Sequence, residues 1–331
     1  MSKSNIGGRI IAIFSAILVT GLIAWGINYL ALPAMTFQSE GFWWFWLVVG
    51  IIGVICYFIA NEIVNELSVE DGGYILGIVI AIGVAVWLLV FIITGITGGV
   101  MAKATQYSKV ITVQDGNFSE DIPEINTDDI VVIDVKTARK LGDRTIATIP
   151  NASWYDVDDE YNLVIINGKK YRISPVNYGS VWKFFKADEA GIPGYVLVEA
   201  TKKDAEARYV ELDEPIRYSP SACFEYDLSR HLRNEYPSYI FGKAFFEVDD
   251  EGNPFWVTGV KTAQVGMRGA LITTSVVVTN AVTGETEEYF LENLPDWIDH
   301  AESVKELMRS LEWHYSYRDG WWNSVTSKTN V

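Results

Sequence analysis

The sequence predicts a three-helix transmembrane module followed by an α+β domain, in which helices pack on antiparallel sheets. Two observations carry this prediction. Three long runs without a charged side chain precede residue 103, and each is long enough to cross a bilayer as a helix. The remainder alternates short runs of β-branched and aromatic residues with amphipathic stretches, a pattern typical of strands and helices that share one core.

The three uncharged runs are residues 10–32, 42–60 and 72–102. The second run opens with an aromatic cluster from Phe42 to Trp46, and tryptophan prefers the headgroup level of a bilayer, so this cluster predicts an interfacial anchor. Ionisable residues inside a membrane mark ion and proton pathways, and none lies within the three runs. We therefore interpret the module as an anchor and not as a transporter.

The distribution of charge limits the partners that we expect. Of 26 basic and 42 acidic residues, three and five lie in residues 1–103, which leaves a net charge of −14 for the rest. An acidic domain repels phosphate backbones, which argues against nucleic acid as a partner. The expected partners are the lipid bilayer, another membrane or envelope protein, and a second copy of the chain.

Motifs for catalysis and for cofactors are missing from the sequence. Cys56 and Cys223 lie in different segments and form no C-x-x-C motif, so neither a disulfide nor a redox or zinc site is expected. The sequence also lacks H-E-x-x-H, G-x-S-x-G, a P-loop and G-x-G-x-x-G. We predict no catalytic residue, no bound metal and no cofactor, and we favour a protein that is not an enzyme.

The orientation in the membrane follows from the basic residues beside the spans. Lys3 and Arg9 flank the first run, and Lys103 and Lys109 follow the third, so the positive-inside count is balanced. The first helix usually dominates the orientation. The prediction is a multi-pass protein of the bacterial inner membrane with its amino terminus inside and its carboxy-terminal domain outside.

We divide the chain into three segments. The transmembrane anchor occupies residues 1–103, a β-rich membrane-proximal segment occupies residues 104–175, and the α+β domain occupies residues 176–331.

Within the membrane-proximal segment we expect strands at residues 109–113 and 129–133 and a short helix at residues 135–141 that ends at Gly142. Asn167-Gly168 between two β runs is the strongest short-range signal of a hairpin.

A helix followed by strands is predicted twice in the α+β domain, at residues 180–211 and 219–291, which suggests an internal duplication. The second of these helices opens at Ser219-Pro220, and Phe224, Leu228 and Leu232 form its apolar stripe.

A last amphipathic helix is expected from Pro295 onward, with Trp297, Ala301, Val304, Met308 and Leu311 on its apolar side.

Residues 246–257 predict a hairpin whose turn is acidic. Asp249, Asp250 and Glu251 are weak candidates for metal ligands. An EF-hand loop needs glycine at its sixth position and a bidentate acid at its twelfth. Counting from Glu247 puts Gly252 in the correct place but Thr258 at the twelfth, so a solvated turn is the favoured interpretation.

A basic group in and near the second helix offers an interaction or anion site, because guanidinium groups bind carboxylates and phosphates bidentately. The alternative is that these side chains pair with neighbouring acids and that the histidine is structural. The group consists of Arg217, Arg230, His231 and Arg233.

Several phrases of the sequence resemble those of a family of uncharacterised bacterial and phage multi-span membrane proteins. They are Gly191 to Tyr195 (GIPGY), Arg230 to Arg233 (RHLR), Phe246 to Trp256 (FEVDDEGNPFW) and Leu294 to Asp299 (LPDWID). The resemblance covers most of the chain after residue 121 and implies an architecture without implying an activity.

A looser resemblance is to PepSY-type modules, in which a helix is followed by strands and a turn like Asn280 to Glu285 (NAVTGE) leads into the last strand. Such modules usually have Asp where Asn280 stands. The resemblance implies a membrane-linked α+β unit associated with the regulation of proteases at the cell envelope.

Three functions remain open from the sequence. The leading hypothesis is a membrane-anchored envelope accessory or scaffold protein whose acidic soluble domain mediates protein–protein contacts without catalysis. The alternative is a PepSY-like regulator or inhibitor of a membrane protease. A third is an enzyme with a site between the two repeats, which would require Arg230, His231 and the acidic hairpin to converge.

Overall fold

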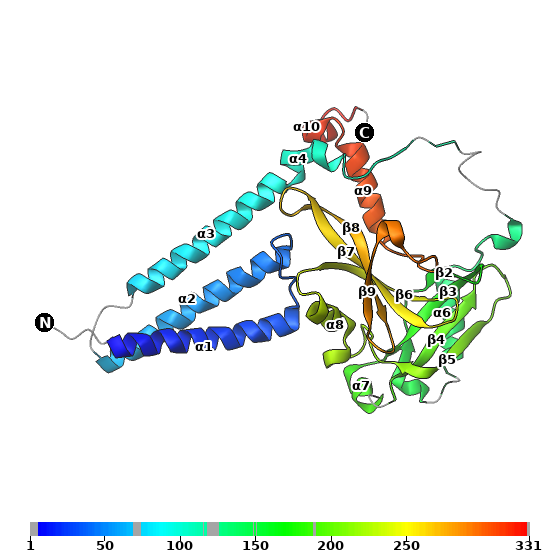
Figure 1. Cartoon of the computed structure of the whole chain (residues 1–331), viewed down its shortest axis with the longest axis horizontal. Helices are drawn as coiled ribbons and strands as arrows, with labels where there is room; N and C mark the ends of the chain where they lie inside the picture. The colour runs from blue at the N-terminus through cyan, green and yellow to red at the C-terminus, as the bar shows by residue number, and fades with distance from the viewer. Residues whose placement is uncertain are drawn as a thin grey trace. The chain divides into compact units, whose positions relative to one another are not determined.

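The computed structural model describes residues 6–68, 74–114, 116–117, 126–147, 149, 151–187 and 190–329 (Figure 1). The chain separates into two compact units that are interleaved along the sequence. We name the first the membrane unit, which comprises Met1–Val110, Ala263–Leu271 and Trp313–Val331. The second, the sheet unit, comprises Ile111–Thr262 and Ile272–Glu312.

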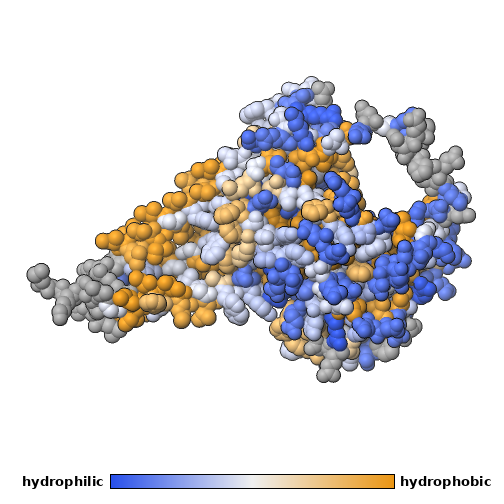
Figure 2. Space-filling view, in the orientation of Figure 1, coloured by the Kyte–Doolittle hydropathy of each residue, from blue (hydrophilic) through white to orange (hydrophobic). Residues whose placement is uncertain are grey.

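The membrane unit contains three long apolar helices, α1 (Ile6–Ala31), α2 (Glu40–Ser68) and α3 (Tyr74–Gly98). All three are long and apolar enough to cross a membrane, which confirms the prediction of three candidate spans. Helix α2 packs against both of the others, and apolar residues cover much of the visible face of these helices (Figure 2). Helix α2 extends to Ser68, beyond the end of the second uncharged run at residue 60.

The membrane unit also holds α4 (Val100–Tyr107), α10 (Gly320–Val325) and the tip of a β-hairpin around Gly266. The Tyr107 ring packs edge-on against Trp313, with ring centroids 5.1 Å apart, and forms a small core with Val265 and Ala270.

Two segments far apart in the sequence hold the hairpin tip at one end of the spans. Gln38, between α1 and α2, accepts a hydrogen bond from the Ala263 amide at 3.0 Å. The Tyr107 hydroxyl, beyond α3, accepts one from the Ala270 amide at 3.1 Å. The α1–α2 connection and the exit of α3 therefore lie at the same end of this unit, as three crossings of one membrane require.

The sheet unit is built on two antiparallel sheets. The first, sheet 1, has the order β1-β3-β4-β5, with β2 also paired to β3. The second, sheet 2, has the order β6-β7-β8-β9, and the tips of β7 and β8 continue into the membrane unit. The strands are β1 (Tyr155–Val157), β2 (Asn162–Ile166), β3 (Lys169–Tyr178), β4 (Ile192–Glu199), β5 (Ala207–Ile216), β6 (Ile240–Val248), β7 (Pro254–Val265), β8 (Gly269–Asn280) and β9 (Thr286–Phe290).

Among the described residues of the sheet unit, four α-helices accompany the sheets, and α6 packs on β1, β4 and β5. The largest core joins both sheets, with Val196 and Val198 of β4 and Phe246 of β6 almost fully buried. Antiparallel sheets with packed helices confirm the coarse fold class. The helices are α6 (Val135–Ile146), α7 (Val181–Ala187), α8 (Leu228–Glu235) and α9 (Val304–Ser316), and the short 3₁₀ turns are η1 (Thr127–Asp129), η2 (Ala152–Trp154), η3 (Phe224–Tyr226) and η4 (Leu291–Asn293).

Both predicted hairpins of the sheet unit are present. Asn167 and Gly168 adopt φ values of 48° and 77°, the left-handed pair that a two-residue hairpin turn requires. The acidic turn joins β6 to β7 as expected, with Phe246 paired to Trp256 across the two strands.

The predictions for residues 109–146 need correction. Residues 109–113 and 129–133 form no strand; the amides of Val132 and Ile133 instead both donate to the Ala200 carbonyl, at 2.9 and 3.1 Å. Helix α6 does not end at Gly142 but runs on to Ile146. Gly142 is needed inside the helix, because a Cβ atom there would overlap the Tyr161 hydroxyl.

Two predicted helix starts were also wrong. The Ser219 segment forms a turn, and α8 begins only after Asp227, whose carboxylate accepts a hydrogen bond from the Arg230 amide at 2.8 Å. Leu228 and Leu232 are buried as expected, whereas Phe224 has a φ of 56° and is exposed.

Similarly, α9 starts at Val304 rather than Pro295. Trp297 and Ala301 precede it and pack against a small core around Val257 and Val276 of sheet 2.

The observed units have other bounds than the three expected segments. The expected boundary between residues 175 and 176 falls inside β3, where Val176 is fully buried. Three separate stretches of the chain make up the membrane unit.

Candidate functional site

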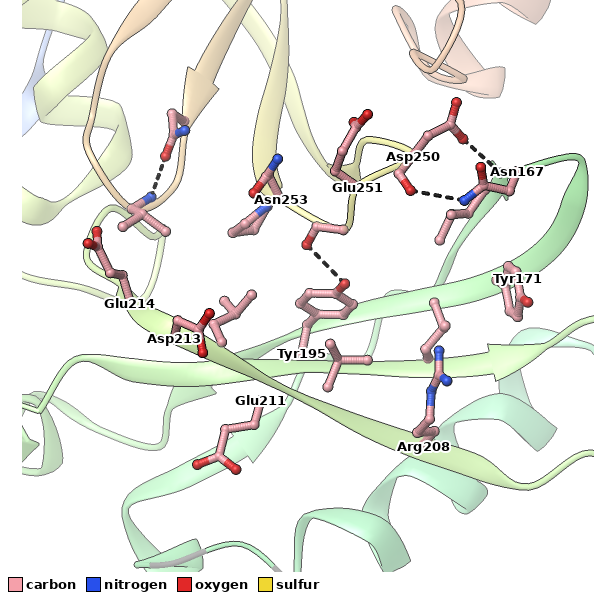
Figure 3. Close-up of a pocket in the computed structure, with 18 of the residues that line it drawn as sticks. Asn167, Tyr171, Tyr195, Arg208, Glu211, Asp213, Glu214, Asp250, Glu251 and Asn253 are labelled. Carbon is pink, nitrogen blue, oxygen red and sulfur yellow. Dashed lines mark hydrogen bonds between the residues drawn. The ribbon is translucent and has the colours of Figure 1, made fainter.

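The sheet unit contains an open cleft of about 840 Å³ (Figure 3). Its floor is formed by β4 and β5, which contribute Tyr195, Leu197, Val210 and Leu212. The β6–β7 turn and the β8–β9 turn cover it from the other side. Period-two alternation explains the floor, because every second residue of a strand points to the same face of the sheet.

Charges of opposite sign lie at the two ends of this cleft. Arg208 stands at one end with Tyr171, and Asp213 and Glu214 stand at the other (Figure 3). Lys169, two residues before Tyr171 on β3, also lines the cleft. The cleft therefore offers an apolar floor between a basic and an acidic end.

Tyr195 links the floor of the cleft to its cover. Its hydroxyl donates a hydrogen bond to the Gly252 carbonyl at 3.1 Å, and Gly252 has a φ of 91° that favours glycine. Burial raises the pKa of the Tyr195 hydroxyl to about 12. The hydroxyl therefore stays protonated near neutral pH and remains a donor.

The acidic turn above the cleft is held by its own side chains. The Asp249 carboxylate accepts hydrogen bonds from the amides of Glu251 (3.1 Å) and Asn253 (2.8 Å) and from the Asn253 side chain (2.8 Å). Asp250 accepts one from the Asn167 amide at 2.7 Å, and Glu251 points away from Tyr195 (Figure 3).

The acidic residues of this turn thus do not converge on one point. Within the parts of the chain that the structure describes, no group of three or more His, Cys, Asp or Glu side chains is arranged to hold a metal ion.

The basic group predicted as an anion site lies outside the cleft lining. The Arg233 guanidinium donates to the carbonyls of Tyr236, Pro237 and Tyr239, at 2.7 to 3.3 Å, and lies 5.3 Å from the centroid of the Phe241 ring. It thereby satisfies carbonyls at the end of α8, and burial lowers its pKa.

The other three members of the basic group do not converge with the acidic turn. The His231 Nε2 atom lies 2.7 Å from the Gly284 carbonyl oxygen, and its ring packs against Tyr218 with centroids 4.4 Å apart. Arg230, on the same helix, uses its backbone amide in the Asp227 cap. Neither Arg217, Arg230 nor His231 lines the cleft.

Sequence reasoning counted Glu247 with the acidic turn and missed that this carboxylate is buried in the sheet unit. Its side chain is 0 % exposed. One oxygen lies 2.8 Å from the His300 Nδ1 atom, and the other accepts a hydrogen bond from the Asp299 amide at 2.9 Å. Burial raises the pKa of the Glu247 carboxyl, and the hydrogen bonds from His300 and Asp299 oppose that rise.

This contact fastens the segment before α9 to β6. The Asp299 carboxylate in turn accepts a hydrogen bond from the Ile165 amide at 2.7 Å. No local signal in the sequence indicated this burial, because an acid between two apolar neighbours such as Phe246 and Val248 is the ordinary alternation of a strand with one solvated face. A fully buried acid is rare unless it is paired, as Glu247 is with His300.

Among the described residues, the lining of the cleft combines acidic, basic, amide, tyrosine and aliphatic side chains, and it holds no histidine, cysteine or serine.

The fold and the site together define an α+β protein with three candidate membrane spans and an open cleft in its sheet unit. Comparison of the chain with protein-family models, with curated proteins and with solved structures finds no match. The geometry of the cleft and of the membrane helices therefore carries the functional argument.

Proposed function

We propose that this protein is a membrane-anchored accessory or scaffold protein that holds an extended segment of a partner protein in the cleft of its sheet unit, without catalysis. The observation that carries the proposal is the cleft itself, an apolar floor between a basic end at Arg208 and an acidic end at Asp213 and Glu214.

An extended polypeptide matches each part of this surface. Its apolar side chains would cover Leu197, Val210 and Leu212, and a carboxylate and a cationic side chain would meet the two charged ends. Among the described strands, β5 pairs only with β4. Its other edge can therefore accept a further strand through main-chain hydrogen bonds, a recurring mode of peptide recognition.

The partner that we propose is another membrane or envelope protein, with a second copy of this chain as the alternative. A net charge of −16 disfavours nucleic acid.

Site-specific photocrosslinking in cells tests this proposal. A photoreactive amino acid at Leu212, on the cleft floor, is expected to give one discrete protein adduct. The same group at Val181, an exposed residue of α7, serves as the control and should not give that adduct. Arg208→Glu combined with the Leu212 probe should reduce the adduct at least fivefold. An identical adduct from both positions, or none from Leu212, would contradict the proposal.

We further propose that the chain lies in a bacterial inner membrane with the sheet unit outside. Three spans put the amino terminus and the segment that follows α3 on opposite sides of the membrane. The sheet unit begins after α3, so it would lie on the side opposite the amino terminus. Labelling of Cys223, which is partly exposed, with a membrane-impermeant maleimide in intact cells tests the side. Labelling that occurs only after lysis would mean that the sheet unit lies inside and that the proposed orientation is wrong.

The repeated order of elements supports an internal duplication. The bounds of the two repeats differ from those that the sequence suggested. Helix α6 precedes strands β1 to β5, with α7 inserted between β3 and β4, and α8 precedes the meander β6-β7-β8-β9. We propose these as the two repeats, in place of residues 180–211 and 219–291.

A helix followed by a four-stranded meander is also the reason to retain a PepSY-like regulator of a membrane protease as the second candidate function. Under that alternative, loss of the protein should change the turnover of envelope proteins in a pulse-chase experiment. Unchanged turnover would remove this candidate and leave the scaffold proposal standing. Membership of the uncharacterised multi-span family remains part of the proposal, supported by the phrases that the sequence shares with it.

A further inference from the structure

The membrane unit contains an apolar groove between α2 and α3. It consists of two adjoining hollows of about 590 and 430 Å³. Phe37, Gly83 and Trp87 line both of them. Trp46 and Val84 extend the groove on one side, and Met267 of the hairpin tip closes the other. A combined volume of this order is in the range of ligand-binding pockets.

The groove is open because of Gly83. A Cβ atom built there meets no other atom within 4 Å, so nothing fills the space in front of the helix. The walls are fixed by hydrogen bonds: the Trp43 indole donates to the Phe37 carbonyl at 2.9 Å, and the Trp87 indole donates to the Trp43 carbonyl at 3.2 Å. The two aromatic walls are therefore held in place, and the groove is preformed.

A cation stands next to the Met267 end of the groove. The Arg268 guanidinium donates to the Phe91 carbonyl at 2.6 Å and lies 4.2 Å from the centroid of the Phe91 ring. Its Nε and Nη1 atoms are buried and have no hydrogen-bond acceptor within the described part of the chain. The guanidinium carbon also lies 5.7 Å from the ring centroid of Trp43, which lines the groove, so its positive charge favours an anionic group at this end.

We propose that the groove binds one phospholipid, with an acyl chain along Gly83 and Trp87 and its phosphate near Arg268. Both helices that form the groove are long and apolar enough to span a membrane, so lipid is the medium that surrounds them. The aromatic cluster at the start of α2 marks the headgroup level, where a lipid phosphate meets a basic pocket between helices. The charge of Arg268 selects an anionic headgroup.

The test uses the full-length protein, purified in mild detergent and exposed to phosphatidylglycerol, with retained lipid counted by native mass spectrometry. Gly83→Leu places a side chain in the open space and should reduce the retained lipid at least tenfold. Gly26→Leu is the matched control, because a Cβ atom at Gly26 of α1 also meets nothing within 4 Å. This control should retain lipid as the unaltered protein does.

A second variant, Val86→Trp, fills the groove from another wall position, so one misfolded variant does not decide the result. Equal thermal unfolding of the variants and the unaltered protein verifies the fold. Retention of lipid by both groove variants at the level of the Gly26→Leu control would overturn the proposal.

A further arm separates a lipid from free phosphate and tests the headgroup. The unaltered protein should retain phosphatidylglycerol over phosphatidylcholine, and Arg268→Gln should abolish this preference. Inorganic phosphate at millimolar concentration should not displace the lipid. Displacement by phosphate, or an unchanged preference in Arg268→Gln, would overturn the assignment of the headgroup. Arg208→Glu, in the sheet unit, should leave lipid retention unchanged, so the lipid site and the proposed peptide cleft can fail separately.

Discussion

The two ends of strand β7 show opposite ways of stabilising a turn. At its start, the turn from Asp249 to Asn253 is polar and lies over the cleft of the sheet unit. At its end, the turn around Gly266 belongs to the membrane unit. One tyrosine hydroxyl contacts each turn: Tyr195 donates to the Gly252 carbonyl at 3.1 Å, and Tyr107 accepts from the Ala270 amide at 3.1 Å while donating to the Gly98 carbonyl of α3 at 2.9 Å.

The difference lies in how much each turn depends on distant residues. Asp249 satisfies three donors within four residues of itself, so the first turn is largely local. The second turn relies on Gln38, Phe91 and Tyr107, which lie more than 150 residues away in the sequence. Changes at the second turn should therefore cost more free energy of unfolding than equivalent changes at the first.

The largest effect is expected from Gly269→Val in the second turn. A Cβ atom at Gly269 would overlap the Gly98 carbonyl and crowd the Tyr107 hydroxyl. Overpacking of this kind should lower the free energy of unfolding by about 3 kcal/mol. Gly252→Ala is the counterpart in the first turn, where the strain of a positive φ should cost about 1 kcal/mol. Thermal unfolding in detergent measures both, and equal losses would contradict the comparison.

A smaller difference in the free energy of unfolding is expected between the Tyr107→Phe and Tyr195→Phe variants. Tyr107→Phe removes a hydroxyl that donates to Gly98 and accepts from the Ala270 amide, and it leaves a buried donor without its acceptor. The loss should be about 2 kcal/mol. Tyr195→Phe removes a single hydrogen bond and should cost about 1 kcal/mol. The same unfolding measurement ranks them, and the reverse order would be inconsistent with a more dependent second turn.

Glu247, two residues before the first turn, is expected to affect how the free energy of unfolding changes with pH. Because burial raises the pKa of this carboxyl above its ordinary value of 4.5, the folded protein binds the proton more tightly than the unfolded chain does. The Glu247 contribution to the free energy of unfolding is therefore complete below pH 4.5 and is lost as pH rises through the folded pKa.

Glu247→Gln should remove that part of the pH dependence, because glutamine does not titrate and can still accept from the Asp299 amide. Urea unfolding of both proteins between pH 4 and pH 8 gives the difference. A difference that does not change with pH would exclude a role for the Glu247 proton.

The smallest effect is expected from Asp249→Ala. The substitution removes the acceptor of three hydrogen bonds in an exposed turn, where water can replace the protein acceptor. The loss should be about 1 kcal/mol or less. Asp250→Ala, which removes the acceptor of the Asn167 amide, provides a control within the same turn.

The features that sequence reasoning predicted correctly are those with a local cause. Hydrophobic length alone indicates the three spans, and Asn167-Gly168 determines a hairpin through the left-handed φ values of two adjacent residues. The failures have distant causes. Gly142 resembles a helix end in the sequence, yet Tyr161, from a neighbouring element, requires a glycine there inside α6.

The candidate site was less accessible to prediction than the fold. The cleft joins residues from β3, β4 and β5 with two turns of sheet 2. No spacing of residues along the sequence predicts that these segments lie together. The acidic turn drew attention through its charges, but the structure uses Asp249 and Asp250 as acceptors for backbone amides. Glu247, counted with that turn, proved to be the buried partner of His300.

The interleaving of the two units limits how the protein can be dissected. A fragment that begins after α3 would keep both sheets but would leave behind Gln38, Phe91 and Gly98, which contact the hairpin tip. The fragment would keep Val100, Tyr107 and Trp313, which pack with Val265 and Ala270, but it would lose the hydrogen bonds from the Ala263 amide to Gln38 and from Arg268 to the Phe91 carbonyl. The membrane helices therefore contribute to the stability of the β7–β8 hairpin as well as crossing the bilayer.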